Sequence, residues 1–159
     1  MADQTATLSS ELVEVLPAET VRQTGFTHKF TIPFTQVKNS AWTTDGDTVT
    51  LTLGSTPTKW LVDKVAVDIK TAFVTDGTLG IEIGTDGDTD NFLDVQSAKT
   101  QALLLADTSA TVKTEAGSFG IASDVLVARF STQAANGAPS DISAGEAVVY
   151  LAIRDFAGL

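Results

Sequence analysis

The amino-acid sequence predicts an all-β protein of about eight strands, arranged as a two-sheet sandwich or a closed barrel. Thr is the commonest residue, with 24 copies among 159, and its β-branched side chain favours strands over helices. Short segments of alternating polar and apolar residues are separated by Gly and Asp turns, and no long helical pattern follows residue 26. Apolar residues make up 43% of the chain, which is enough for one folded core.

The first two predicted strands each have one apolar face. In the segment 27–37, alternate positions from His28 to Phe34 hold His, Phe or Ile, which predicts a strand with one buried face. Pro33 offers no amide donor to a ladder, so we expect this strand at a sheet edge or at a bulge. After a turn at 44–47, residues 48–53 alternate Thr with Val or Leu, which predicts a second strand.

The next two strands are predicted to form a β-hairpin. A strand is expected over 61–73, where apolar residues alternate with charged ones. Asp76-Gly77 follows, a pair that tolerates the positive φ of a tight turn. The segment 78–84 then alternates again. We therefore expect the two strands to lie side by side.

The second half of the chain is less regular until its end. Residues 86–106 are expected to be irregular with one short strand, and alternation returns around 110–114, 118–122 and 124–131. The Gly- and Pro-containing segment 133–145 predicts a long surface loop. The last strand, 146–155, is apolar on much of both faces, so we place it in mid-sheet or at a subunit contact.

The first 26 residues differ from the rest. They begin polar, pass through an apolar run at 12–16 and reach Gly25 without a clear period. Two interpretations remain open: an extended arm that docks on a neighbour, or an edge strand of the same domain. We therefore divide the chain into an N-terminal arm or edge segment, 1–26, and a β-sandwich domain, 27–159.

Composition excludes several classes of partner and site. The net charge of −10 opposes binding to nucleic acid or to an anionic membrane. No apolar run reaches the roughly 18 to 20 residues of a membrane span, and we expect no signal peptide. Because the chain has no Cys, it cannot form a disulfide, a thiol nucleophile or a Cys-based metal site.

The sequence predicts no enzyme and no cofactor. His28 is the only histidine, and its place in a strand pattern favours a partly buried structural role over a catalytic triad. No nucleophile-elbow or phosphate-loop motif occurs. Two observations argue against a glycosidase. In the sequence, a catalytic pair of carboxylates cannot be distinguished from aspartates in turns. The aromatic content of 7% is also low for a sugar-binding cleft.

One acidic segment is a weak candidate for a calcium site. Asp86, Asp88 and Asp90 alternate along the chain, as do the first oxygen ligands of an EF-hand loop. The pattern then departs from that motif, because Asn91 and Ser97 stand where Gly and Glu are required. The alternative interpretation is a solvated turn.

The central strands resemble a family of viral coat proteins. The run DTVTLTLG, WLVDKVAVDIKTAF, TDG, TLGIEIG and TDGDTDNFLDVQSA, over 47–98, and the closing strand GEAVVYLAIRDF resemble capsid decoration (cement) proteins of tailed bacteriophages. The resemblance implies a jelly-roll-like antiparallel β-sandwich. It also implies a homotrimer on the outer capsid surface of the virion, bound to the major capsid protein and stabilising its shell.

The resemblance leaves the N-terminal segment and one alternative function open. If residues 1–26 form an arm that grips the capsid, its contacts are expected at the apolar run Leu12, Val13, Val15 and Leu16. The alternative function is a receptor- or carbohydrate-binding domain of a phage head fibre or tail. That domain would present its site on loops such as 85–90 and 133–145, which contain no aromatic residue.

Overall fold

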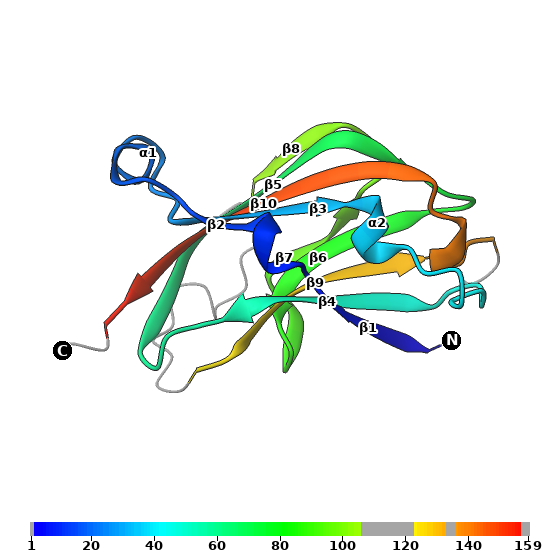
Figure 1. Cartoon of the computed structure of the whole chain (residues 1–159), viewed down its shortest axis with the longest axis horizontal. Helices are drawn as coiled ribbons and strands as arrows, with labels where there is room; N and C mark the ends of the chain where they lie inside the picture. Colours follow the sequence, from blue (N-terminus) through cyan, green and yellow to red (C-terminus); the bar gives the residue numbers. More distant parts are fainter. Residues whose placement is uncertain (1, 106–122, 133–135, 157–159) are drawn as a thin grey trace.

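The protein is a β-sandwich of two five-stranded sheets (Figure 1). The computed structural model describes residues 2–105, 123–132 and 136–156. Sheet A has the strand order β1 (Asp3–Thr7), β4 (Thr48–Ser55), β9 (Val125–Thr132), β6 (Leu79–Thr85), β7 (Asp88–Ser97). Sheet B has the order β2 (Val13–Val15), β3 (His28–Pro33), β10 (Ala144–Asp155), β5 (Trp60–Val74), β8 (Ala102–Leu105). The short helices are η1 (Ser10–Leu12), α1 (Ala18–Thr24), α2 (Phe34–Val37) and η2 (Pro139–Asp141).

The last eight strands form a jelly roll. They make two four-stranded sheets, ordered β4-β9-β6-β7 and β3-β10-β5-β8, in which every neighbouring pair is antiparallel. The chain passes back and forth between the sheets, as expected for two interlocked Greek keys. The predicted jelly-roll-like sandwich is confirmed, and the closed barrel is excluded. β10 lies in mid-sheet between β3 and β5, as its two apolar faces predicted.

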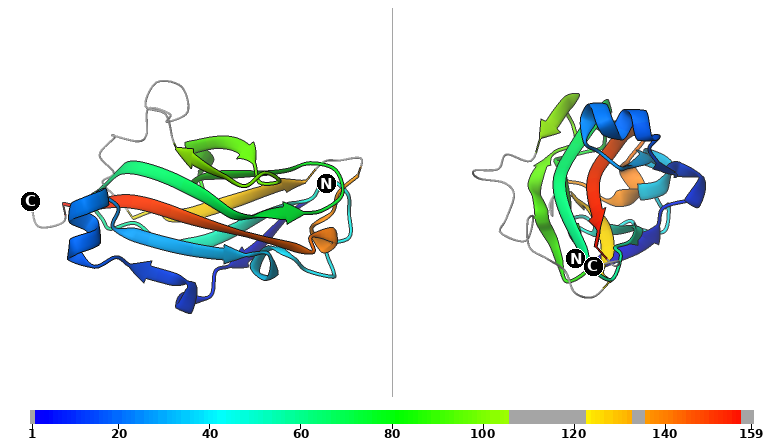
Figure 2. Two further views of the ribbon diagram at one scale, coloured as in Figure 1. Left: turned by 90° about the horizontal axis from the view of Figure 1, so that it is seen from above. Right: turned by 90° about the vertical axis from the view of Figure 1, so that its left-hand side faces the viewer.

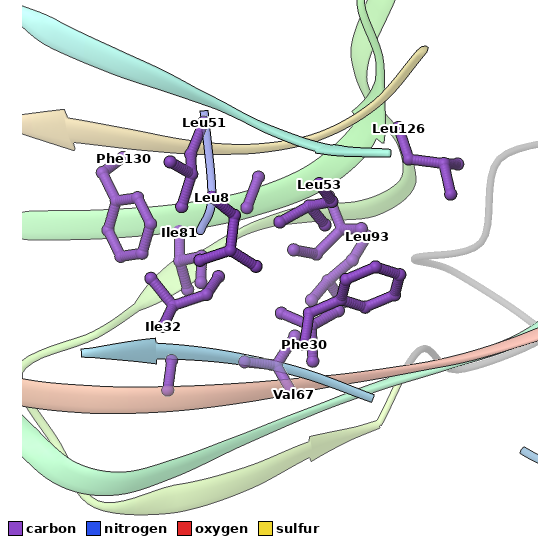
Figure 3. Close-up of a cluster of buried hydrophobic side chains, with 14 of the residues drawn as sticks. Leu8, Phe30, Ile32, Leu51, Leu53, Val67, Ile81, Leu93, Leu126 and Phe130 are labelled. Atoms are coloured by element: carbon purple, nitrogen blue, oxygen red, sulfur yellow. The ribbon is translucent and has the colours of Figure 1, made fainter. Parts of the chain in front are cut away.

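The core lies between the sheets and follows the alternation of the strands. Figure 3 shows Phe30, Ile32 and Val67 of sheet B facing Leu51 and Phe130 of sheet A. All five are at most 2% exposed. Burying each such side chain contributes about 1.5–3 kcal/mol, so the inward faces of both sheets supply the main stabilisation of the domain.

Two expectations about individual strands are wrong. β5 and β6 do not form a hairpin, because β5 belongs to sheet B and β6 to sheet A. Gly77 does adopt a positive φ of 67°, but this turn carries the chain across the sandwich rather than back along one sheet. The segment 86–106 is also more regular than expected, since it contains the ten-residue β7 and then β8.

Other expectations differ in detail. β3 ends at Pro33, and Phe34 begins the short helix α2 instead of continuing the strand. β2 pairs only with the first three residues of β3, and Pro33 lies beyond them. The amide hydrogen that Pro33 lacks therefore removes no hydrogen bond between β3 and β2. The strands expected at 110–114 and 118–122 lie outside the described residues. The predicted loop at 133–145 contains η2 in its described part.

The N-terminal segment contributes one edge strand to each sheet. β1 pairs in parallel with β4, and β2 pairs antiparallel with β3. Between them Leu8 enters the core at 4% exposure. The buried carboxylate of Asp47 accepts hydrogen bonds from the Ala2 amide at 2.6 Å and from Gln4 Nε2 at 3.1 Å. The segment 2–15 therefore runs along one open side of the sandwich (Figure 2).

In the described part of the chain, no helix has the length and apolar character needed to cross a bilayer.

Candidate functional surfaces

The apolar run of the N-terminal segment is divided between the core and the surface. Leu12 and Val13 are partly buried and pack against the core. Leu16 is half-buried, and its amide donates to the Thr27 carbonyl at 2.8 Å. Val15 is 73% exposed on the outermost strand of sheet B. Of the four predicted contact residues, Val15 is thus the one whose side chain is largely free to meet another molecule.

Helix α1 projects from the sandwich next to this strand (Figure 1). None of its residues is buried. It ends at Gly25, which has a φ of 79° and whose amide donates to the Val21 carbonyl at 2.7 Å. Glu19 and Arg22 form an exposed ion pair at 2.7 Å within the helix. The helix therefore adds surface beside Val15 without contributing to the core.

His28 occupies a half-buried position at the start of β3. Its ring stacks on Phe30 with a centroid distance of 6.2 Å, and its Nδ1 lies 2.7 Å from Thr27 Oγ1. Desolvation lowers the pKa of His28 from its usual value of 6.5. The Thr27 hydroxyl also accepts from the Ile153 amide at 2.9 Å. These contacts are structural, since they join β3 to the end of β10.

The acidic segment considered for calcium lies at the turn between β6 and β7. Asp86 is exposed in the turn, Asp88 is exposed at the start of β7, and Asp90 is partly exposed within it. Neither these aspartates nor any other described residues form a group of three acidic or histidine side chains placed to hold a metal ion. The calcium site at Asp86, Asp88 and Asp90 therefore stays a prediction from the sequence pattern.

The turn does bring together two carboxyl groups that the sequence keeps far apart. The Asp124 carboxyl, just before β9, lies close enough to that of Asp86 for the two groups to interact. Burial and this neighbouring carboxyl raise the pKa of Asp124 above its usual 3.8. Backbone bonds hold the two residues in place: the Asp86 amide donates to the Val125 carbonyl at 3.0 Å, and the Asp124 amide donates to Thr56 Oγ1 at 2.7 Å.

A chain of polar contacts crosses the outer face of sheet A. Asp3 on β1 accepts from the hydroxyls of Thr48 and Thr50 on β4 at 2.7 and 2.9 Å. Arg129 on β9 lies 3.4 Å from Glu82 on β6. Glu82 in turn accepts from a hydroxyl of β7, Thr89 Oγ1, at 2.6 Å. The contacts thus involve all five strands, and their residues are too far apart in sequence for a motif to reveal them.

A shallow acidic hollow lies where three loops meet. Asp45, Asp76 and Asp141 line it together with Gly77 and Asn136. The Asp141 carboxylate accepts from the Ala138 amide at 3.1 Å. The three carboxylates do not form a group placed to hold a metal ion. The hollow therefore adds negative surface at this point.

The side of the sandwich opposite the N-terminal segment ends in two edge strands, β7 and β8. Leu103 and Leu105 of β8 are 60% and 62% exposed, and Val95 of β7 is 54% exposed. Leu103 and Leu105 pair in register with Asp68 and Ala66, so they face outward from sheet B. Val95 lies instead on the outer face of sheet A, because a Cβ on Gly80 of β6 would come within 2.4 Å of its Cγ2.

Comparisons with known proteins identify no family for this chain. No protein-family model and no curated protein matches it. Among solved structures, the chain is similar to PliG of Aeromonas hydrophila, a periplasmic inhibitor of g-type lysozyme. The identity is 12%, the match covers 96% of this chain and 99% of that one, and the TM-score is 0.32.

Proposed function

We propose that this chain is a capsid decoration protein that binds the outer surface of a tailed-bacteriophage shell as a homotrimer and stabilises it. The role is mechanical. A protein that binds the assembled shell and not its separated subunits adds its binding free energy to the stability of the shell. Support comes from the resemblance of 47–98 to such proteins and from the jelly-roll order of strands β3 to β10.

The charges of the two sheets support a defined orientation on the shell. The strands of sheet A carry one basic and five acidic residues, whereas those of sheet B carry four basic and five acidic ones. The outer face of sheet A is also covered with hydroxyls and hydrogen-bonded charges. A strongly acidic polar face suits contact with solvent. We therefore assign sheet A to the outward side of the particle.

The observation that carries the shell contact is the exposure of Val15. An exposed valine on an edge strand, beside a projecting helix, is an apolar contact that the folded chain leaves uncovered. The backbone that holds Val15 is fixed, because β2 pairs with β3 and Leu8 anchors the same segment in the core. A fixed contact loses less entropy on binding than a flexible arm does. We assign this side to the major capsid protein.

Co-sedimentation with undecorated shells tests the proposal. The shells are assembled from the major capsid protein of the genome that encodes this chain. We expect the wild-type protein to sediment with them and Val15→Lys to lose at least tenfold in affinity. Val74→Lys is the matched control, since Val74 is 53% exposed at the end of β5, outside the N-terminal segment. Wild-type protein that stays in the supernatant would contradict the proposal.

A further inference from the structure

Val15 and His28 are direct neighbours in sheet B. They pair in register between the antiparallel strands β2 and β3, and His28 pairs in turn with Leu151 of β10. Directly opposed residues of antiparallel strands point to the same side of the sheet, with Cβ atoms about 4.5–5.5 Å apart, so the three side chains form one row. Exposure falls along this row from 73% at Val15, through the half-buried imidazole of His28, to 0% at Leu151. His28 thus stands at the boundary between solvent and core.

The imidazole of His28 is held in this position by its other contacts. Its ring stacks on Phe30 with a centroid distance of 6.2 Å and an interplanar angle of 11°, and its Nδ1 lies 2.7 Å from Thr27 Oγ1. The Thr27 hydroxyl is fixed in turn, because it accepts from the Ile153 amide at 2.9 Å. Turning the ring away from Val15 would break its contacts with Phe30 and Thr27. The ring therefore keeps its place when another molecule covers Val15.

The charged groups around β3 do not face His28. The strand packs mainly against β2, β10, η1 and α2, and the charged residues of these elements are Glu11 of η1, Glu14 of β2, and Glu146, Arg154 and Asp155 of β10. Glu14 pairs with Lys29 and so points to the other side of the sheet. Along β10, Glu146 and Arg154 alternate with Leu151 in the same way. Glu11 and Asp155 are exposed. Burial lowers the pKa of His28, so its protonation depends on how much water reaches the ring.

We propose that protonation of His28 opposes the covering of Val15 by another molecule, so that binding through this side of the sandwich weakens at acid pH. The inference rests on the proposed contact of Val15 with the shell and adds a regulation of that contact. A partner that packs on Val15 removes water from the imidazole beside it, and an imidazolium without water or a counter-ion is costly. Binding therefore releases the proton, and by linkage the bound proton weakens binding to the same extent.

The pH range follows from the direction of the pKa shifts. The pKa of His28 in the free protein lies below 6.5, and a partner on Val15 lowers it further. Affinity is then complete above pH 6.5 and falls as the pH falls through the pKa of the free protein. Each unit by which the partner lowers this pKa corresponds to about a tenfold loss of affinity at acid pH.

An NMR titration of the isolated protein tests the coupling of the two residues. Because His28 is the only histidine, a single imidazole signal reports its pKa. Val15→Ala uncovers the ring, so we expect the pKa of His28 to rise towards 6.5, and Val15→Phe covers more of it, so we expect this pKa to fall. Val74→Ala is the matched control, since Val74 is an exposed valine of β5 outside the row. An unchanged pKa of His28 in both Val15 variants would overturn the inference.

Co-sedimentation with undecorated shells at pH 7.5 and pH 5.5 tests the effect on binding. We expect the wild type to lose at least about threefold more affinity on acidification than His28→Gln, whose side chain does not titrate; this ratio corresponds to half a pKa unit. Circular dichroism at both pH values confirms that each protein stays folded. Equal losses of affinity in the two proteins would also overturn the inference. Wild-type protein that stays in the supernatant at both pH values contradicts the proposed function instead, and the NMR titration alone then decides the inference.

Discussion

Arg129 Nη1 on β9 lies 3.4 Å from the Glu82 carboxylate on the neighbouring strand β6. Glu82 is only 8% exposed although its side chain faces outward from sheet A. The Arg129 guanidinium also lies 4.0 Å from the Asp3 carboxylate of β1 through its Nε. The cation thus stands between acidic residues of the N-terminal edge strand and of the jelly roll.

Removal of this cation should destabilise the fold. Arg129→Met leaves the nearly buried Glu82 carboxylate without its positive neighbour, which costs about 1–3 kcal/mol of unfolding free energy. Urea denaturation at pH 7 measures this loss. Arg154→Met is the control, because Arg154 pairs with Asp63 at 2.8 Å in an exposed position and its loss should cost less than about 1 kcal/mol. Equal effects of the two substitutions would refute the importance of Arg129.

Gly145 cannot be replaced by a larger residue without strain. Its φ is 133°, and a Cβ at this position would lie 2.4 Å from Cγ of Phe73, a side chain of the core. Gly145→Ala should therefore lower stability by about 2–4 kcal/mol. Gly54→Ala, where a Cβ meets nothing within 4 Å, should change it by less than about 0.5 kcal/mol. Thermal unfolding of both variants provides the comparison, and an undisturbed Gly145→Ala protein would contradict the packing described.

The pH dependence of stability should carry a signature of His28. Burial lowers the pKa of His28 in the folded chain, so the unfolded chain takes up a proton first as the pH falls below 6.5. Stability should then fall as the pH falls below that value. His28→Gln does not titrate, so its stability should depend less on pH between 7 and 5. Urea denaturation measures the unfolding free energy of both proteins at each pH. If this free energy changes equally with pH in the wild type and in His28→Gln, His28 makes no contribution.

The carboxyl pair of Asp86 and Asp124 should have the opposite effect. Burial and the neighbouring carboxyl raise the pKa of Asp124 in the folded chain, so the folded state binds the proton more readily than the unfolded one. The protonated Asp124 carboxyl therefore stabilises the fold at acid pH. This stabilisation is lost as the pH rises from 3.8 through the raised pKa of Asp124. Asp86→Asn removes the repulsion, and we expect a gain of a few tenths of a kcal/mol at pH 7. If Asp86→Asn gains as much unfolding free energy at pH 4 as at pH 7, the two carboxyls do not repel each other in this way.

Much of the fold follows from local alternation. The pattern placed Val49, Leu51 and Leu53 on one face of a strand, and all three are buried in β4. Alternation assigns faces because successive side chains of a strand point to opposite sides. It does not identify the neighbouring strand, and for this reason the turn at Asp76-Gly77 predicted a hairpin where the chain crosses between sheets.

The features that the sequence did not reveal depend on irregular pairing or on distant residues. β7 was missed because its pairing with β6 shifts register twice, between Ile81 and Ile83 and between Ile83 and Thr85. Bulges of this kind break the period of two on which strand prediction relies. The contact of Asp86 with Asp124 joins separate parts of the chain, so nothing local predicts it.

Saturation binding is the most direct test of the proposal that this chain decorates a phage shell. Purified protein is titrated onto undecorated shells of the encoding genome, and the bound copies are counted. We expect saturation at three copies for each local threefold position, together with a higher melting temperature of the decorated shell. Absence of binding to shells, with binding to glycans or to host cells instead, would contradict it.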